Sequence, residues 1–174
     1  MGILGALFGG KKSKTTSAEV KSPADVYLGL RSKALTVQPE MIGVPADGSL
    51  LAILMETVQS GAVVTLVGMA DGTTSLYFSN GGGIIGSGQH EPVAVATKAW
   101  LARAAAEFAS SMTATTEFPL PAPGQARFYL VYADRVLTAE AVENHLGYNR
   151  HPLSLLFHEG HKVINQVRLH SPRR

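Results

Sequence analysis

The sequence predicts an α+β domain, in which an antiparallel sheet of four or five strands carries helices packed on it. Two pairs of β-prone segments, near 62–79 and 126–142, each enclose a turn signal and read as hairpins. Between them, the Ala-rich segment near 91–113 contains no Gly or Pro after Pro92 and predicts a long helix. Because a helix and then a hairpin occur twice before a final helix, we expect a layered α+β fold.

Length and composition favour one compact domain. The chain has 174 residues, of which 45% are hydrophobic and 16% charged, enough apolar material for one sizeable core. We expect a domain at 22–170 between an N-terminal tail, 1–21, and a basic C-terminal tail, 171–174. The absence of cysteine excludes disulfides, cysteine metal ligands and a thiol nucleophile, and fits the cytoplasmic location that we expect.

The formal net charge of +2 is concentrated in the N-terminal tail. Residues 1–21 carry four lysines and one glutamate, so the rest of the chain sums to −1. The domain therefore lacks the basic surface that nucleic-acid binding needs. The segment from Met1 to Lys14 contains a short apolar stretch followed by lysines. The apolar stretch is too short to span a bilayer, and a secretory signal would carry its lysines before the apolar stretch. Weak membrane-surface or partner contact and a disordered tail both remain open.

The elements before the first hairpin follow from caps and periodicity. Ser22 at the N-cap and Pro23 at the first helical position predict a short helix to about Ser32. Residues 34–46 contain two prolines and are expected to be extended. Apolar residues at helical spacing predict a helix near 49–60 that ends at Gly61: Leu50, Leu51, Leu54, Met55 and Val58.

A glycine-rich loop at 80–91 follows the first hairpin, whose turn signal is Asp71-Gly72. Gly81, Gly83 and Gly86 match G-x-G-x-x-G, but the hairpin before the loop and the long helix after it do not form the β-α-β unit of a dinucleotide fold. A structural crossover, in which Ile84 and Ile85 enter the core, is favoured over contact with a partner, ligand or anion. The residues for such contact are Asn80, Gly81, Gly82, Gly83, Gly86, Ser87, Gly88 and His90.

The long helix has few charges, so it needs cover on more than one side. The sheet can cover one face, and the N-terminal helix, the C-terminal helix or a second subunit must cover another. If a partner does so, Trp100, Arg103 and Glu107 are the expected interface residues.

The second half of the domain ends in a helix and a group of histidines. A polar loop is expected at 143–152 and a helix at 153–169, which Gly160 should weaken. Five of the six histidines lie after residue 144. His158 and His161 are three residues apart, where a zinc helix of the H-E-x-x-H type needs four, so we expect a solvated polar face and keep a metal site as the weaker alternative.

The order of helices and hairpins over about 22–169, with the long helix of small residues, resembles the roadblock and profilin-like small domains. Two sequence segments also look like those of bacterial proteins without an assigned activity: 71–79 with Gly81-Gly82-Gly83, and His151-Pro152-Leu153-Ser154 with Leu156-Phe157. Roadblock-like domains act through dimerisation and partner binding, so the resemblance implies a protein partner or a homodimer.

We therefore expect a non-catalytic interaction or regulatory module, without a cofactor, whose Ala-rich helix and neighbouring sheet edge bind a partner or a second copy. The alternative is a small-ligand or anion-binding protein, with or without enzymatic activity, that uses the glycine-rich loop 80–91.

Overall fold

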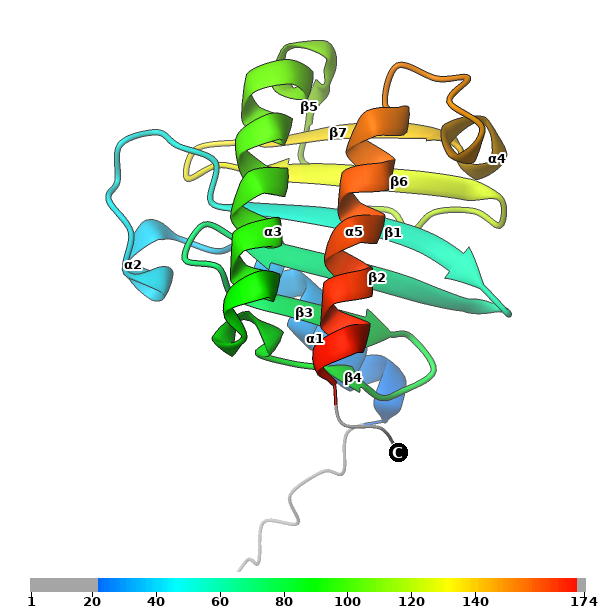
Figure 1. Cartoon of the computed structure of the whole chain (residues 1–174), viewed down its shortest axis with the longest axis horizontal. Helices are drawn as coiled ribbons and strands as arrows, with labels where there is room; N and C mark the ends of the chain where they lie inside the picture. Colours follow the sequence, from blue (N-terminus) through cyan, green and yellow to red (C-terminus); the bar gives the residue numbers. More distant parts are fainter. Residues whose placement is uncertain (1–21, 172–174) are drawn as a thin grey trace, which may run out of the picture.

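A computed structural model describes residues 22–171 and contains one seven-stranded antiparallel sheet with helices on both faces (Figure 1). The strand order is β4-β3-β2-β1-β6-β7-β5. The strands are β1 (Ala52–Gln59), β2 (Ala62–Met69), β3 (Thr74–Phe78), β4 (Gly83–Ile84), β5 (Thr113–Thr115), β6 (Gln125–Val131) and β7 (Val136–Val142). The α-helices are α1 (Pro23–Leu35), α2 (Pro39–Ile42), α3 (Glu91–Arg103), α4 (Glu143–Gly147) and α5 (Ser154–His170). The α+β class is confirmed, and the expected count of four or five strands is wrong.

The helices form two layers around the sheet. In Figure 1, α3 and α5 cross the near face and α1 lies behind the sheet. The near core, between the sheet and helices α3 and α5, includes Met55, Trp100 and Leu156. The far core, between the sheet and α1, includes Tyr27 and Tyr129. Helix α3 packs against both the sheet and α5, so the C-terminal helix supplies the second cover that its composition requires, while Val95, Ala99 and Ala102 remain exposed.

The helix expected at 49–60 is wrong, because Ala52–Gln59 is β1, the central strand. Its residues Ile53 and Met55 contribute to the near core while Leu54 contributes to the far core. A strand buried on both faces shows an unbroken apolar run, whose periodicity does not distinguish it from a helix. Ser60 and Gly61, with φ of 50° and 80°, make the tight turn into β2.

Both predicted hairpins are confirmed. In the first, β2 pairs with β3 and Val64 lies opposite Phe78. In the second, β6 pairs with β7, with Gln125 opposite Val142. Asp71 fixes the first turn, because its carboxylate accepts hydrogen bonds from the amide and the hydroxyl of Thr73 at 2.8 Å each.

The predicted helices at both ends and in the centre are confirmed with shifted limits. At the start of α1, the Asp25 amide donates to the Ser22 hydroxyl at 3.2 Å, and the Ser22 amide donates to the Asp25 carboxylate at 3.1 Å. Helix α3 continues as a π-helical turn, Ala104–Phe108, and a 3₁₀ turn, Ala109–Ser111. Two expectations are corrected: α2 lies within the segment expected to be extended, and α4 within the expected polar loop.

Gly160 has a structural role that its low helix propensity conceals. A Cβ atom at this position would lie 2.8 Å from the Met55 side chain and 3.1 Å from that of Trp100. The absence of a side chain therefore lets α5 approach the sheet and α3 closely, which offsets the cost of glycine within the helix.

The N-terminal tail, with the membrane or partner contact expected for Met1 to Lys14, lies outside the described residues, as do residues 172–174 of the C-terminal tail. Among the residues that are described, no helix is both long and apolar enough to cross a bilayer.

Candidate functional site

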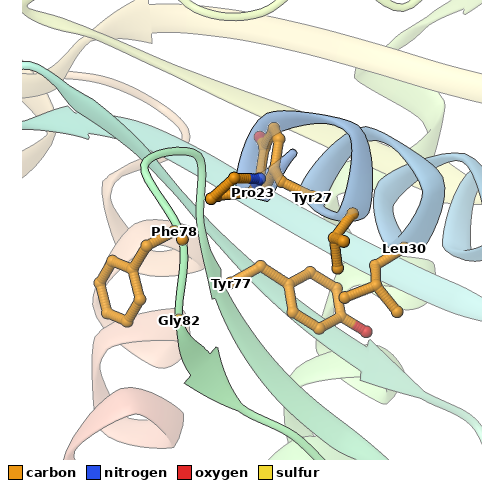
Figure 2. A pocket seen from close by; sticks show the side chains of 8 residues that line it. Pro23, Tyr27, Leu30, Tyr77, Phe78 and Gly82 are labelled. Carbon is orange, nitrogen blue, oxygen red and sulfur yellow. The ribbon is translucent and has the colours of Figure 1, made fainter. Parts of the chain in front are cut away.

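An apolar groove lies on the far face of the sheet, between the first turns of α1 and the turn that joins β3 to β4. We call it the α1 groove, and its volume is about 300 Å³. Figure 2 shows Pro23 beside the turn that carries Gly82, and the Tyr77 ring extending towards Leu30. Its lining residues are Pro23, Val26, Tyr27, Leu30, Tyr77, Phe78, Gly81 and Gly82.

Backbone geometry leaves the groove open at its glycine end. Gly81 and Gly82 have φ of 104° and 83°, in the left-handed region that favours glycine. A Cβ atom on Gly81 would lie 3.0 Å from the Pro23 Cβ, so a side chain there would press against the start of α1. The turn therefore abuts α1 without filling the space between them.

A buried ion pair holds α1 on the sheet. The Arg31 guanidinium donates from Nε to Glu56 Oε1 at 2.7 Å and from Nη2 to Oε2 at 2.8 Å. The side chains of Arg31 and Glu56 are 7% and 0% exposed, and Glu56 lies in the central strand β1. The pair therefore joins the wall of the groove to the most buried part of the sheet.

Further hydrogen bonds satisfy the polar atoms around this pair. Thr65 donates its hydroxyl hydrogen to Glu56 Oε1 at 3.0 Å, so the Tyr27 hydroxyl, 2.8 Å from Thr65, is the donor of that second bond. Arg31 Nη1 donates to the Phe118 carbonyl at 2.9 Å. The result is a hydrogen-bonded buried network, which sets the position of α1 rather than offering reactive groups.

Electrostatics keeps Tyr27 neutral and Arg31 charged. Burial raises the pKa of Tyr27, so the phenol stays protonated. Burial opposes the charge on Arg31, but the hydrogen bonds and attraction of Glu56 outweigh it and raise the pKa of the guanidinium. Arg31 therefore remains cationic beside Glu56.

The structure divides the glycine-rich loop between two places. Gly81 and Gly82 line the α1 groove, whereas Gly83 lies in β4, opposite Tyr77. Ser87 and Gly88 form a 3₁₀ turn before α3, and a Cβ on Gly88 would lie 2.1 Å from the Gly72 carbonyl oxygen. The candidate residues from Asn80 to His90 therefore do not surround one site. Ile84 packs against the core, but Ile85 is 67% exposed, so the expectation that both enter the core is half wrong.

Four amides of this loop donate hydrogen bonds within the protein. The amides of Gly81, Gln89 and His90 donate to carbonyl oxygens of the same loop region, and that of Gly86 donates to the Ser75 hydroxyl. These four bonds tie the loop to itself and to β3, and the anion alternative stays a prediction.

The expected interface on the long helix is corrected at Trp100. Its side chain is fully buried, and the indole N–H donates to the Leu156 carbonyl at 3.0 Å. Trp100 therefore joins α3 to α5 and is not available to a partner. Arg103 and Glu107 lie at the surface and pair with each other at 3.1 Å. The largest exposed apolar side chain on α3 is Val95, 59% exposed.

A second, more polar cleft lies on the near face, beside α5. Two hollows of about 630 and 480 Å³ share Glu143 and His161, and we call them together the α5 cleft. The first is lined by Gly124, Val142, Glu143, Asn144, Gly147, Phe157, His158 and His161. The second is lined by Thr57, Gln59, Val64, Leu76, Phe78, Glu143, His161, Ile164 and Arg168.

His161 departs from the solvated face expected for it. Its Nε2 atom is buried and has no hydrogen-bond partner among residues 22–171, and its ring packs against Phe157 at 4.4 Å between centroids. Burial, followed by the nearby His158, lowers the pKa of His161. The side chain is therefore a neutral imidazole at pH 7 with an unused nitrogen.

The described histidines do not assemble a metal site. His158 Nε2 lies 2.9 Å from Asn149 Oδ1, and His151 Nδ1 accepts a hydrogen bond from the Leu153 amide. Within 22–171, no group of three or more His, Cys, Asp or Glu residues could hold a metal ion. The two-histidine alternative gains no support from this arrangement.

Sequence reasoning missed the α1 groove and the Arg31–Glu56 pair. One signal was present, since Glu56 interrupts an otherwise apolar run and a buried carboxylate needs a cation. The α5 cleft was indicated only by the histidine cluster. Comparisons with protein-family models, with curated proteins and with solved structures found no match for this chain.

Proposed function

We propose that this protein is a non-catalytic interaction module and that the α1 groove holds an apolar side chain of a protein partner. The observation that carries the proposal is a groove with apolar walls beside a side chain, Val26, that is 47% exposed. Exposed apolar surface that surrounds a concavity is typical of protein-interaction sites.

The size of the groove favours a side chain over a cofactor. Its volume of about 300 Å³ is at the lower end of the range of about 300–1,000 Å³ for sites that enclose drug-sized molecules. Two of its side chains carry hydroxyl groups, those of Tyr27 and Tyr77, and the Tyr27 hydroxyl already bonds to Thr65. The remaining lining is apolar or glycine. Leu, Ile, Met or Phe on a partner segment would match these walls.

Rigid walls also support binding. The Arg31–Glu56 pair fixes α1, and Tyr77 comes from a strand paired on both sides. A preformed groove reduces the conformational entropy lost on association. The expected homodimer remains part of the proposal, with a second copy as the partner.

Two substitutions on α1 provide a matched test. Val26 lines the groove, whereas Leu28 is 49% exposed on the same helix and does not line it. Val26→Asp places a charge in the groove, and Leu28→Asp makes the same change outside it. Both positions are exposed, so we expect both variants to fold.

The assay selects displayed random peptides on the immobilised full chain and measures the affinity of the selected peptides by fluorescence anisotropy. We expect enrichment of one large apolar residue per peptide. Val26→Asp should weaken binding roughly 10- to 150-fold, which corresponds to the loss of one buried apolar side chain, and Leu28→Asp should change it less than about twofold. Failure to enrich any peptide, or equal losses in the two variants, would refute the groove as the binding site.

Sedimentation velocity on the same variants tests the homodimer, which Val26→Asp should dissociate if a second copy occupies the groove.

A further inference from the structure

The geometry points to a second binding site, in the α5 cleft, for a small monocarboxylate with an apolar body. This site lies on the opposite face of the sheet from the α1 groove, and Phe78 borders both. It combines a large hollow, an apolar floor, and polar groups that have no partner within the described chain.

The apolar part of the cleft lies next to Arg168. Val64, Phe78 and Ile164 are partly buried hydrophobic side chains that line the hollow of about 480 Å³. Val64 and Phe78 lie opposite each other on β2 and β3, so they form a continuous floor. An apolar body on this floor would exclude water from surfaces that the fold leaves incompletely covered.

Arg168 supplies the charge that selects a carboxylate. Within residues 22–171 its exposed guanidinium makes no hydrogen bond or ion pair, although it lines the same hollow. Guanidinium groups bind carboxylates through paired N–H donors. Glu143 also lines the cleft, and the hydrogen bond that it accepts from the neutral Gln59 amide at 2.9 Å leaves its negative charge in place. The ligand carboxylate must therefore lie at Arg168 and away from Glu143.

His161 and Thr57 determine the polar character of the inner end. Seven residues separate His161 from Arg168 on α5, about 10 Å along the helix axis. The His161 Nε2 atom has no hydrogen-bond partner among the described residues. Thr57 is a buried residue, 7% exposed, and its hydroxyl also makes no hydrogen bond within the described part of the chain. With one arginine, one carboxylate and a mostly apolar floor, the cleft fits a monoanion whose carboxylate lies at Arg168 better than a doubly charged phosphate.

The test titrates the full-length protein with butanoate, hexanoate and octanoate and follows binding by calorimetry and by the imidazole NMR signals. We expect affinity to rise roughly fourfold for each added methylene that is buried on the floor, until the floor is filled. Hexanamide should bind at least about fivefold more weakly than hexanoate, because it lacks the charge that Arg168 pairs with. The His161 signals should shift on binding, while those of the exposed His145 should not.

Arg168→Gln should weaken octanoate binding about 5- to 10-fold and remove the preference for hexanoate over hexanamide. Arg150→Gln is the matched control, because this exposed arginine does not line the cleft. Absence of octanoate binding at low millimolar concentration overturns the proposal. Tighter binding of hexylamine than of hexanoate, or equal effects of the two arginine variants, also overturns it.

Discussion

Replacing Arg31 with methionine tests how α1 is held in place. The change leaves Glu56, a side chain with no exposed surface, without the cation that neutralises it. Removal of one partner of a buried ion pair costs about 3–5 kcal/mol, far more than an exposed pair contributes. Methionine keeps much of the side-chain length, so the loss reports on charge and hydrogen bonding more than on an empty volume.

We expect the free energy of unfolding, measured in urea at pH 7, to fall by about 3–5 kcal/mol. For a domain of this size, the melting temperature should fall by roughly 6–20 °C. Because α1 forms one wall of the groove, peptide affinity should also fall under conditions in which the variant remains folded.

Lys33→Met is the matched control, since it removes the same charge from an exposed position on the same helix and should change stability by less than about 0.5 kcal/mol. The double variant Arg31→Met, Glu56→Leu removes both charges and should recover at least half of the loss. A loss below about 1 kcal/mol for Arg31→Met, or a double variant whose losses simply add, would refute the stated role of the pair.

Three further predictions concern stability. Gly160→Val should destabilise the fold by about 1–3 kcal/mol in urea unfolding, because its side chain would meet Met55 and Trp100; an unchanged midpoint would contradict the close packing of α5. Ser22→Ala should cost about 1 kcal/mol by loss of the N-cap, whereas a neutral result would argue against that cap. The lowered pKa of His161 means that the unfolded chain binds this proton more readily, so stability should fall as the pH drops from about 6.5 through the folded-state value. His161→Gln, compared by urea titration from pH 7.5 to 5, should reduce this fall, and identical pH profiles would rule out the burial effect. The charged or titratable neighbours lining the cleft, Glu143, His158 and Arg168, are unchanged in that comparison.

The sequence predicts the hairpins and the longer helices because local signals determine them. Asp71-Gly72 specifies a turn, and Ser22 with Pro23 specifies a helix start, without information from the rest of the chain. The apolar run of β1 predicts a helix because burial on both faces removes the alternation that identifies a strand, and only the assembled sheet supplies the second face.

Long-range contacts explain why the sites could not be predicted. The partner of Glu56 lies 25 residues away, and the two walls of the α1 groove come from segments about 50 residues apart. Trp100 was expected at an interface because its helix has apolar residues around most of its circumference, but Gly160 allows α5 to cover it. The edge strands β4 and β5 are too short to produce a periodic pattern.

The ends of the sheet constrain how this protein can associate. β4 has two residues and β5 has three, so the edge strands themselves present few backbone donors and acceptors to another chain, although β5 covers β7 only from Val136 to Thr138. Short edge strands oppose extension of a sheet from one molecule into the next. We therefore expect a partner, including a second copy, to recognise side chains on the faces of the domain more than a sheet edge, and we expect the longer central strands to be shielded from the strand pairing that leads to aggregation.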